Sequence, residues 1–504
     1  MSLPWLNVAN TKRVGLVSKK FEVLVIGGGP AGSTAASLLA RAGMSVKLLE
    51  RAVFPRYHIG ESITTSCRGI LDYLGALEKV NSRGYTSKSG ALLRWGKEDD
   101  WVIDWTQQFG PDMRSWQVER ADFDHVLLEH AKESGVDVVE GARVKKVLFE
   151  GDRAIGAEWV APETGEIVTT HADFVLDASG RAGLIGAQHL DNRQPHEIFR
   201  NVAIWGYWDG GELLPNSPKG GINVVSSDDG WYWVIPLSGD RFSVGFVTHK
   251  TNFGERRKEF GSIEDMLLAM IAESPTVKGL VASGTFQGKA RVEQDFSYVA
   301  DRFCGDGYFL MGDAACFLDP LLSTGVHLAM YSGLLTAASI SGMAHGDVTP
   351  TEAQSFYETL FRNAYVRLFT LVSGFYQKHA GKDRYFALAN SLARDETVSE
   401  ETADVAFGEI ISGGTDLREA ADISGKASES IDQVIVEQKQ QKSPVRELLD
   451  AAAEAQERAR LAAGQQERLT PDTAIDTNDL YDVGNGFYLL MEPRLGVGKV
   501  NADA

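Results

Sequence analysis

The strongest pattern of apolar and polar positions in the 504-residue chain lies at residues 21–62. The apolar run Val23 to Ile26 predicts a buried parallel strand. A helix of small and apolar residues follows, and Gly43 ends it in the manner of a left-handed cap. A second apolar run, Val46 to Leu49, predicts the next parallel strand. The pattern therefore predicts a strand–helix–strand unit near the start of an α/β domain.

Hydrophobic periodicity predicts the remaining elements in outline. Helical spacing is found at residues 63–80, 117–135, 262–273, 352–379 and 443–464, and the chain is mainly helical from Gly325 onward. β-branched and aromatic runs predict strands at 89–105, 136–139, 142–177 and 308–311 and a multi-stranded sheet at 200–250. We expect the aromatic stripe of 352–379 to be core, and the apolar stretch 487–498 to pack on the body of the protein.

Glycines occupy the turn between the first strand and helix. Gly27, Gly29 and Gly32 form a G-x-G-x-x-G sequence, and Glu50 ends the second strand 21 residues after Gly29. Glycines at this spacing allow a tight turn and close approach of the backbone to a pyrophosphate, which the helix N-terminus stabilises. The acidic residue is placed to bind ribose hydroxyls. We therefore predict a dinucleotide site.

Composition limits the classes of partner. The chain has 50 Lys and Arg against 69 Asp and Glu, a net charge of −19, which argues against a nucleic-acid or anionic membrane surface. Its three scattered cysteines have no metal-ligand spacing and are typical of the reducing cytoplasm. No run of about 18 apolar residues predicts a membrane span, and residues 1–20 lack the apolar centre of a secretion signal.

Later segments extend the dinucleotide reading. Asp177-Ala178-Ser179-Gly180 and Gly312-Asp313-Ala314-Ala315 each follow a predicted strand, and residues 117–120 begin a predicted helix. In this order they resemble the FAD-binding half of aromatic-hydroxylase-type flavoproteins. The resemblance implies that Arg120 and Asp313 contact FAD together with the three glycines and Glu50.

We accordingly expect an α/β fold with a Rossmann-like FAD-binding domain, a β-rich substrate domain and a mainly helical C-terminal region. The FAD-binding module would span residues 21–345 discontinuously, with β-rich insertions roughly at 85–116 and 185–295. Residues 346–504 would form the helical region.

Four local features resemble the flavin-dependent halogenases. Trp231 and Trp233 stand in a W-x-W-x-I-P sequence, and Lys88 matches the position of the active-site lysine of that family. Residues 319–327, DPLLSTGVH, resemble the loop that binds halide through Thr324 and Gly325, and residues 60–62, GES, resemble the loop after the first strand–helix–strand unit. Taken singly, each feature has an ordinary reading: two tryptophans on one strand face, a surface lysine, or a strand-to-helix loop.

The resemblance is to halogenases of phenols or of acyl groups on carrier proteins rather than to tryptophan halogenases. It implies that FADH2, O2 and chloride or bromide generate hypohalous acid, which Lys88 directs to an electron-rich phenolic or pyrrolic ring, as in antibiotic biosynthesis. The two tryptophans would separate flavin and substrate. A separate flavin reductase would supply FADH2, because no second nucleotide fingerprint is present.

Other readings remain open at this point. An FAD- and NAD(P)H-dependent aromatic hydroxylase shares the cofactor module but leaves Lys88 and the W-x-W-x-I-P sequence without a purpose. A saturase or reductase of isoprenoid chains also shares the fold. A non-enzymatic alternative is a flavin-binding sensor or scaffold in which the long C-terminal region does the work. No general base for removal of the ring proton is evident in the sequence.

Overall fold

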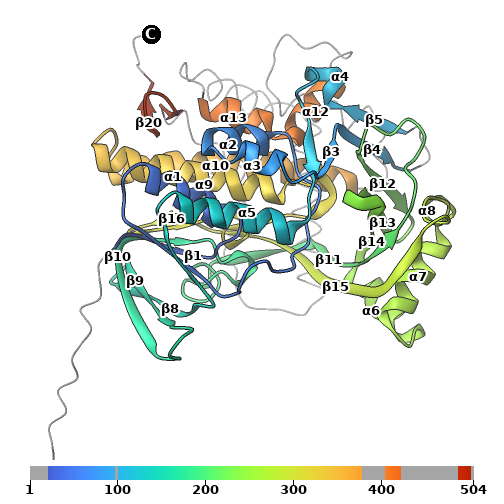
Figure 1. The fold of residues 1–504 in the computed structure, drawn as a ribbon, viewed down its shortest axis with the longest axis horizontal. Helices are drawn as coiled ribbons and strands as arrows, with labels where there is room; N and C mark the ends of the chain where they lie inside the picture. Colours follow the sequence, from blue (N-terminus) through green and yellow to red (C-terminus); the bar gives the residue numbers. More distant parts are fainter. Residues whose placement is uncertain (1–20, 97–99, 377–402, 422–485, 501–504) are drawn as a thin grey trace, which may run out of the picture.

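The structure, a computed structural model, describes residues 21–96, 100–376, 403–421 and 486–500 (Figure 1). It is a mixed α/β fold, as predicted. Two large sheets lie at opposite ends of a layer of helices, and the chain crosses repeatedly between them (Figure 1).

The first sheet contains the parallel strands that the dinucleotide pattern requires. Their order is β17 (Tyr308–Leu310), β10 (Ile167–Asp177), β1 (Phe21–Ile26), β2 (Val46–Glu50) and β7 (Asp137–Glu140), with β16 (Cys304–Gly305) antiparallel at one edge. The first helix, α1 (Pro30–Arg41), connects β1 to β2. Since β1 lies in the middle of this order, the turn after it lies at the carboxyl ends of its neighbours, where α/β sheets bind ligands.

A three-stranded antiparallel ribbon extends this sheet. Strands β8 (Arg143–Glu150) and β9 (Arg153–Val160) form the hairpin predicted within residues 142–177. Strand β10 belongs to both parts: residues 167–171 pair with β9, and residues 172–177 pair with β1. The ribbon therefore continues directly into the parallel sheet.

The second sheet is the β-rich part of the molecule. Its order is β18 (Cys316–Phe317), β15 (Thr285–Ala300), β11 (Arg193–Asp209), β14 (Arg241–His249), β13 (Gly230–Pro236), β12 (Ile222–Ser227), β4 (Gly90–Arg94) and β5 (Trp101–Asp104). All pairs are antiparallel except β12 with β4. Strands from both β-rich stretches of the sequence thus share one sheet. Helices α6 (Lys250–Arg256), α7 (Ile263–Glu273) and α8 (Pro275–Leu280) accompany it at the right of Figure 1.

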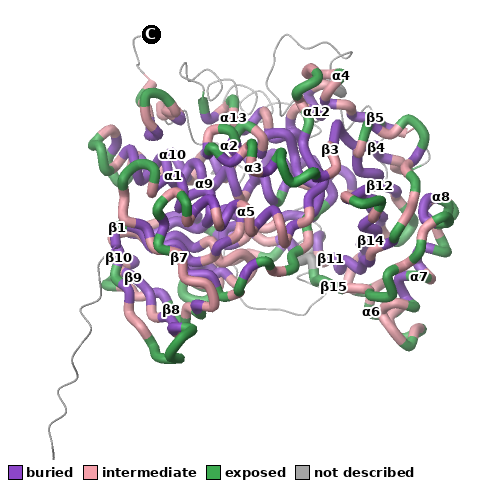
Figure 2. The backbone as a smooth tube through the Cα atoms, viewed as in Figure 1, coloured by how far each residue is buried: buried purple, intermediate pink, exposed green. Residues whose placement is uncertain are grey.

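Two long helices, α9 (Gly325–His345) and α10 (Pro350–Tyr376), form the centre of the helical layer. Helix α9 packs against α1, α10 and α2 (Ser66–Leu74), and most of its residues are buried (Figure 2). The aromatic stripe of α10 is core, as predicted, since Phe356, Leu360 and Phe361 are buried. No helix in the described ranges is long and apolar enough to cross a membrane.

Shorter elements surround this centre. They are α3 (Leu77–Asn81), β3 (Thr86–Lys88) paired with β6 (Ser115–Gln117), α4 (Trp105–Phe109), α5 (Arg120–Glu133), α12 (Ala403–Ser412), α13 (Gly414–Ala421) and the hairpin of β19 (Phe487–Leu490) with β20 (Gly496–Lys499). The hairpin packs on α9, which confirms the expected docking of residues 487–498.

Two predicted elements end earlier than their periodicity indicated. The helix predicted at residues 63–80 is divided into α2 and α3, because Gly75 is left-handed at φ 79° and caps α2. The strands predicted at 89–105 end at Asp104, whose side chain accepts hydrogen bonds from the backbone N–H groups of Thr106 and Gln107 and begins α4. The helix predicted at 443–464 lies outside the described residues.

Candidate active site

The glycines of the first turn serve two different purposes. A Cβ atom on Gly27 would lie 2.2 Å from the carbonyl oxygen of Ala178, and one on Gly32 would lie 1.9 Å from that of Gly27. These two glycines therefore let β1, α1 and β10 approach closely. Gly29 caps α1, and a Cβ atom there would meet only a guanidinium nitrogen of Arg56, at 3.6 Å. The helix N-terminus is thus open on the side where a pyrophosphate would bind.

Glu50 holds this turn in place. One carboxylate oxygen accepts a hydrogen bond from the N–H of Gly28 at 2.7 Å, and the other accepts one from the N–H of Ala52 at 2.8 Å. Each oxygen keeps a second lone pair for a ligand hydroxyl. The structure therefore brings Glu50 to the glycine turn, and its predicted contact with ribose stays a prediction.

Arg120 begins α5 and ties the loop after β2 to that helix. It forms a bidentate ion pair with Asp124, at 2.8 and 3.0 Å, and donates a hydrogen bond to the carbonyl oxygen of Ile59 at 2.8 Å. A Cβ atom on Gly60, which has φ of 103°, would lie 2.8 Å from its guanidinium. Only glycine fits at this position, which explains why a glycine precedes Glu61 in the GES loop.

Asp313 follows β17 in the short turn Gly312–Ala314 and is the feature that best fits a hydroxyl-rich cofactor. Burial raises the pKa of its carboxyl group, which the charges of Arg181, Arg120 and Arg193 oppose. Within the described ranges, no side chain or backbone group donates a hydrogen bond to this carboxylate. Asp313 is only partly buried, and its carboxylate is therefore able to accept hydrogen bonds from the ribityl or ribose hydroxyls of a bound cofactor. The open turn at Gly29 and this carboxylate together fit FAD.

The second acidic loop has a different role. The Asp177 carboxylate accepts hydrogen bonds from the Ser179 hydroxyl at 2.6 Å and from the N–H of Ile185 at 2.7 Å. Both contacts lie within its own loop. The sequence alone would allow this carboxylate to reach the ligand, as is expected for that of Asp313, but in the structure Asp177 fixes the backbone of its own loop.

Trp231 and Trp233 lie on the same face of β13, because alternate residues of a strand share a face. They are 1% and 6% exposed, and their ring centroids are 6.1 Å apart. Gly245 on the neighbouring strand makes room for Trp233, since a Cβ atom there would lie 2.2 Å from the indole ring. The indole N–H of Trp233 donates to the Ser243 hydroxyl at 3.2 Å. The pair forms a fixed aromatic wall.

Tyr376 connects this wall to the predicted halide loop. The indole N–H of Trp231 donates to the Tyr376 hydroxyl oxygen at 2.7 Å, and that hydroxyl donates to the carboxylate of Asp319 at 2.7 Å. Asp319 in turn accepts from the N–H of Leu321 at 3.0 Å. The structure therefore brings two motifs that lie about ninety residues apart in the sequence into one hydrogen-bonded unit.

The predicted halide loop ends at the N-terminus of α9. Ser323 is left-handed at φ 59°, Thr324 is the N-cap without a capping side chain, and Gly325 is the first helical residue. A Cβ atom on Gly325 would meet no atom within 4 Å. Gly325 is exposed, and the first turn of this 21-residue helix has no capping side chain in the described part of the chain, an arrangement suited to an anion.

Lys88 is buried, which excludes the reading of it as a solvated surface lysine. Its side chain is 2% exposed, donates a hydrogen bond to the carbonyl oxygen of Ile63 at 3.1 Å, and lies 4.9 Å from the centre of the Trp105 ring. Burial lowers the pKa of Lys88 to about 7. No carboxylate in the described ranges forms an ion pair with it. An uncompensated buried amine is a marker of function rather than of stability.

A buried carboxyl group was not assigned a chemical role from the sequence. Glu61 is 3% exposed, and one of its oxygens accepts a hydrogen bond from the Tyr207 hydroxyl at 2.6 Å, while the other has no hydrogen-bond partner in the described part of the chain. Burial raises the pKa of Glu61 to about 7, against the hydrogen bond from Tyr207, which lowers it. The GES pattern located the residue, but only the structure shows that it is buried and able to exchange a proton near neutral pH.

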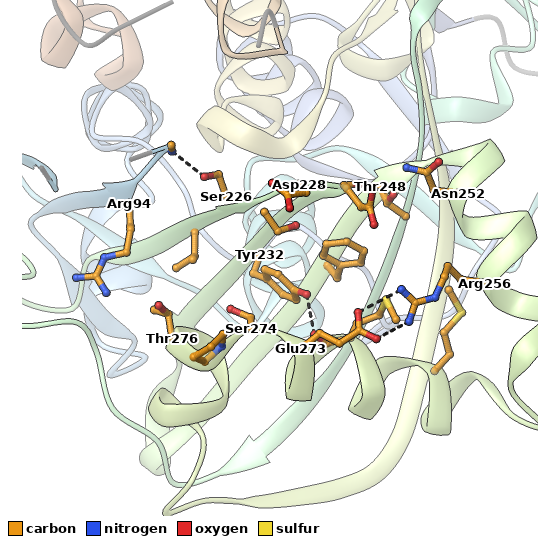
Figure 3. A pocket seen from close by; sticks show the side chains of 18 residues that line it. Arg94, Ser226, Asp228, Tyr232, Thr248, Asn252, Arg256, Glu273, Ser274 and Thr276 are labelled. Carbon is orange, nitrogen blue, oxygen red and sulfur yellow. Dashed lines mark hydrogen bonds and ion pairs between the residues drawn. The ribbon is translucent and has the colours of Figure 1, made fainter. Parts of the chain in front are cut away.

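A separate cavity of about 430 Å³ lies between the second sheet and α7 (Figure 3). Tyr232 reaches it because it alternates with Trp231 and Trp233 and therefore points to the opposite face of β13. Its other lining includes Phe246, Met270 and Glu273. None of the residues predicted for the active site lines this cavity.

The cradle at Gly29 and Asp313 and the parallel sheet around it define a flavoprotein of the FAD-binding class. The family model of the FAD binding domain matches residues 20–347, and this confirms the predicted cofactor.

Relatives give the family within that class. The chain is 42% identical over 404 residues to the Tryptophan 2-halogenase of Chondromyces crocatus, with 79% of this chain and 77% of that protein covered. It is 38% identical over 413 residues to the Flavin-dependent halogenase armH4 of Armillaria mellea, with 77% and 76% covered. The solved structure of the myxobacterial chondrochloren halogenase CndH is similar at a TM-score of 0.67 and 36% identity, covering 80% of this chain and 92% of that one.

The chain belongs to the flavin-dependent halogenases, as its motifs predicted. It is an enzyme that uses FADH2, O2 and halide to halogenate a small aromatic substrate in secondary metabolism.

Proposed function

We propose that this enzyme oxidises a halide bound at the N-terminus of α9 and transfers the halogen to an aromatic ring beside Lys88. The observation that carries the proposal is the burial of Lys88 with no acidic partner among the residues that the structure describes. Burying an ammonium group there has a large desolvation cost. A neutral side chain could donate the same hydrogen bond to a carbonyl oxygen without that cost, so a purely structural role does not explain the lysine.

Each part of the site has a separate task in this proposal. When bound in the cradle of Gly27, Gly29, Gly32, Glu50, Arg120 and Asp313, reduced FAD with O2 supplies the oxidant. The backbone N–H groups of Thr324 and Gly325 hold the halide, because the helix dipole favours an anion there. Trp231 and Trp233 exclude water and keep the substrate away from the cofactor, so that only hypohalous acid reaches the substrate.

Lys88 then directs the halogen. Its ammonium form donates a hydrogen bond to the oxygen of hypohalous acid, which makes that oxygen a better leaving group. The ring attacks the halogen, the oxygen leaves as water after taking a proton, and loss of the ring proton restores aromaticity. A pKa near 7 allows Lys88 to act as this donor and also to react as a free amine to a haloamine.

The substrate we propose is an electron-rich phenolic or pyrrolic ring, free or attached to a carrier protein. The absence of a second nucleotide fingerprint in the sequence supports a separate flavin reductase as the source of FADH2. The name of the Chondromyces crocatus relative adds indole to the rings to be tested and gives no support to the contrast drawn with tryptophan halogenases.

The cellular setting and domain division are proposals of the same kind. Cys67, Cys304 and Cys316 are free and buried, which supports a cytoplasmic enzyme. We propose residues 21–345 as the FAD-binding module, with β-rich insertions roughly at 85–116 and 185–295, and residues 346–504 as the C-terminal region. The two separate sheets support this division.

The test is a substrate screen with a separate flavin reductase, FAD, NADPH and bromide. Intact-mass measurement compares phenolic and pyrrolic carrier-protein thioesters with the free acids and with tryptophan. A mass gain of one bromine on a phenolic or pyrrolic substrate, only when the reductase is present, is the expected result. Rapid oxidation of NADPH and hydroxylated product without reductase would contradict the proposal in favour of an aromatic hydroxylase.

A further inference from the structure

A buried hydrogen-bonded chain joins three helices behind the halide loop. The Ser66 hydroxyl at the start of α2 lies 2.8 Å from Nδ1 of His327, the third residue of α9. Nε2 of the same imidazole lies 2.7 Å from a carboxylate oxygen of Asp416 in α13. All three side chains are 5% exposed or less. A polar chain buried to this extent restricts its members to one arrangement.

The Asp416 end of the chain is fixed by a cation. Arg367 of α10 forms ion pairs with Asp416 and with Glu419, so a buried positive charge lies against the Asp416 carboxylate. The charge of Arg367 and the hydrogen bond from His327 lower the pKa of Asp416, although burial alone would raise it. The carboxylate therefore stays charged and continues to accept the imidazole hydrogen bond at neutral pH.

The other end of the chain reaches Lys88. The Ser66 hydroxyl lies 2.9 Å from that of Thr64. The Ser115 hydroxyl donates to the carbonyl oxygens of Thr64 and Ile63, at 3.1 and 2.8 Å, and Ile63 is the residue whose carbonyl accepts the hydrogen bond from Lys88. The position of the lysine is therefore coupled to the position of the first turn of α9.

A second, independent contact joins the same C-terminal helices to Lys88. The indole N–H of Trp105 donates to the carbonyl oxygen of Gly408 in α12 at 3.1 Å, and the Trp105 ring is the one that covers the Lys88 ammonium. Helices α12 and α13 thus contact both the surroundings of the lysine and the helix that carries the halide loop.

A serine, a histidine and an aspartate in this order also form hydrolytic triads, but the site has no space for a substrate. A Cβ atom on Gly413, which is left-handed at φ 76°, would lie 2.4 Å from the Ser66 hydroxyl oxygen and 2.8 Å from the His327 ring. Peptide backbone therefore covers the hydroxyl that would have to attack.

We propose that Asp416 is a positioning residue, which through His327 and Ser66 fixes the halide-binding turn of α9 relative to Lys88. The C-terminal helices are then part of the catalytic unit. The inference rests on the proposed roles of the halide loop and Lys88. Misplacement of reacting groups by about 1 Å costs on the order of 10²-fold in rate, so a small rotation of α9 is sufficient for a large effect.

The test measures coupling, defined as halogenated product formed per FADH2 oxidised, and the halide KM. Asp416→Asn keeps the size of the side chain and removes its charge, and Ser66→Ala removes the link while leaving the ion pair of Asp416 with Arg367 intact. Asp347→Asn is the matched control, because it breaks a partly exposed ion pair with Arg494 at the opposite end of α9. FAD affinity is measured for each variant.

We expect Asp416→Asn and Ser66→Ala to lower coupling at least about tenfold and to raise the halide KM, with FAD affinity within about twofold. Asp347→Asn should retain wild-type coupling. Wild-type coupling and halide KM in Ser66→Ala would overturn the inference, and this variant decides the question if Asp416→Asn fails to fold. Loss of activity in Lys88→Ala alongside normal coupling in Ser66→Ala would reject the positioning role and leave the proposed function intact.

Discussion

Replacing Lys88 with methionine should make the protein more stable and, at the same time, inactive. The two side chains are similar in length, and methionine avoids the desolvation of an ammonium group. The pKa of Lys88 falls from 10.5 to about 7 in the folded protein. At about 1.4 kcal/mol per pKa unit, burying the charged ammonium group therefore lowers the free energy of unfolding by about 5 kcal/mol. Losing one hydrogen bond and one cation–π contact costs about 1 kcal/mol each, which leaves a gain of about 3 kcal/mol at pH 6.

The same lowered pKa of Lys88 gives the pH dependence of this effect. The folded-state pKa of Lys88 lies below the unfolded value, so the unfolded state binds more protons between about pH 7 and 10.5. The stability of the wild-type protein therefore rises with pH through this window. Below about pH 7 Lys88 is charged in the folded protein, and the loss of stability relative to Lys88→Met reaches its full size. The advantage of Lys88→Met should be largest near pH 6 and should disappear above about pH 10.5.

Urea unfolding at several pH values, with the protein free of cofactor, measures this directly. Lys146→Met is the control, since the Lys146 side chain is 60% exposed and its replacement should change stability by less than about 0.5 kcal/mol. The carbonyl of Ile63 keeps a donor in the variant, because Ser115 also hydrogen-bonds to it at 2.8 Å. A Lys88→Met protein that is less stable than wild type near pH 6, or equally stable at every pH, would show that the buried charge of Lys88 does not destabilise the protein.

Two further predictions concern the halide loop and the buried carboxyl group. Gly325→Val should raise the halide KM at least about tenfold, because the added side chain would fill the open space beside the proposed halide site, and it should leave FAD affinity unchanged, because its Cβ atom would contact no other residue. Loss of FAD would instead place the loop in the cofactor cradle. Gly254→Val, which also adds a side chain in open space on a helix, is the control. Glu61→Gln should stabilise the protein above about pH 7, because the wild-type carboxylate is then charged although it is buried. Below about pH 4.5 the carboxyl group is protonated in both the folded and the unfolded protein, so the substitution should have little effect. Equal midpoints of urea unfolding for the variant and the wild type at pH 8 would contradict this.

The cofactor cradle was predictable from the sequence because its signals are local. The turn at Gly27 and Gly29, the helix after it and the acidic end of β2 lie within thirty residues and depend on backbone conformation that residue type determines. The face shared by Trp231 and Trp233 follows from strand alternation alone. Gly75, in contrast, divides a helix that hydrophobic periodicity extended through it, since periodicity does not record a left-handed cap.

The environment of each proposed catalytic group was not predictable in the same way. The burial of Lys88 is produced by Ile63 and Trp105, which tertiary packing brings together from separate elements. Asp416 lies 89 residues beyond His327, and neither neighbouring sequence indicates their contact. Such environments depend on the packing of whole helices, whereas a motif records only residue identity and spacing.

The most direct test of the account separates formation of hypohalous acid from its use. Wild type, Lys88→Ala and Lys88→Arg are supplied with FADH2, O2, bromide and substrate, and both brominated product and hypobromous acid captured by a diketone trap are measured. We expect both variants to form hypobromous acid at close to the wild-type rate and to make no brominated product, because alanine has no amine and the planar guanidinium of arginine cannot replace the compact amine. Full product formation by Lys88→Ala, with unchanged flavin oxidation, would contradict the central role of Lys88.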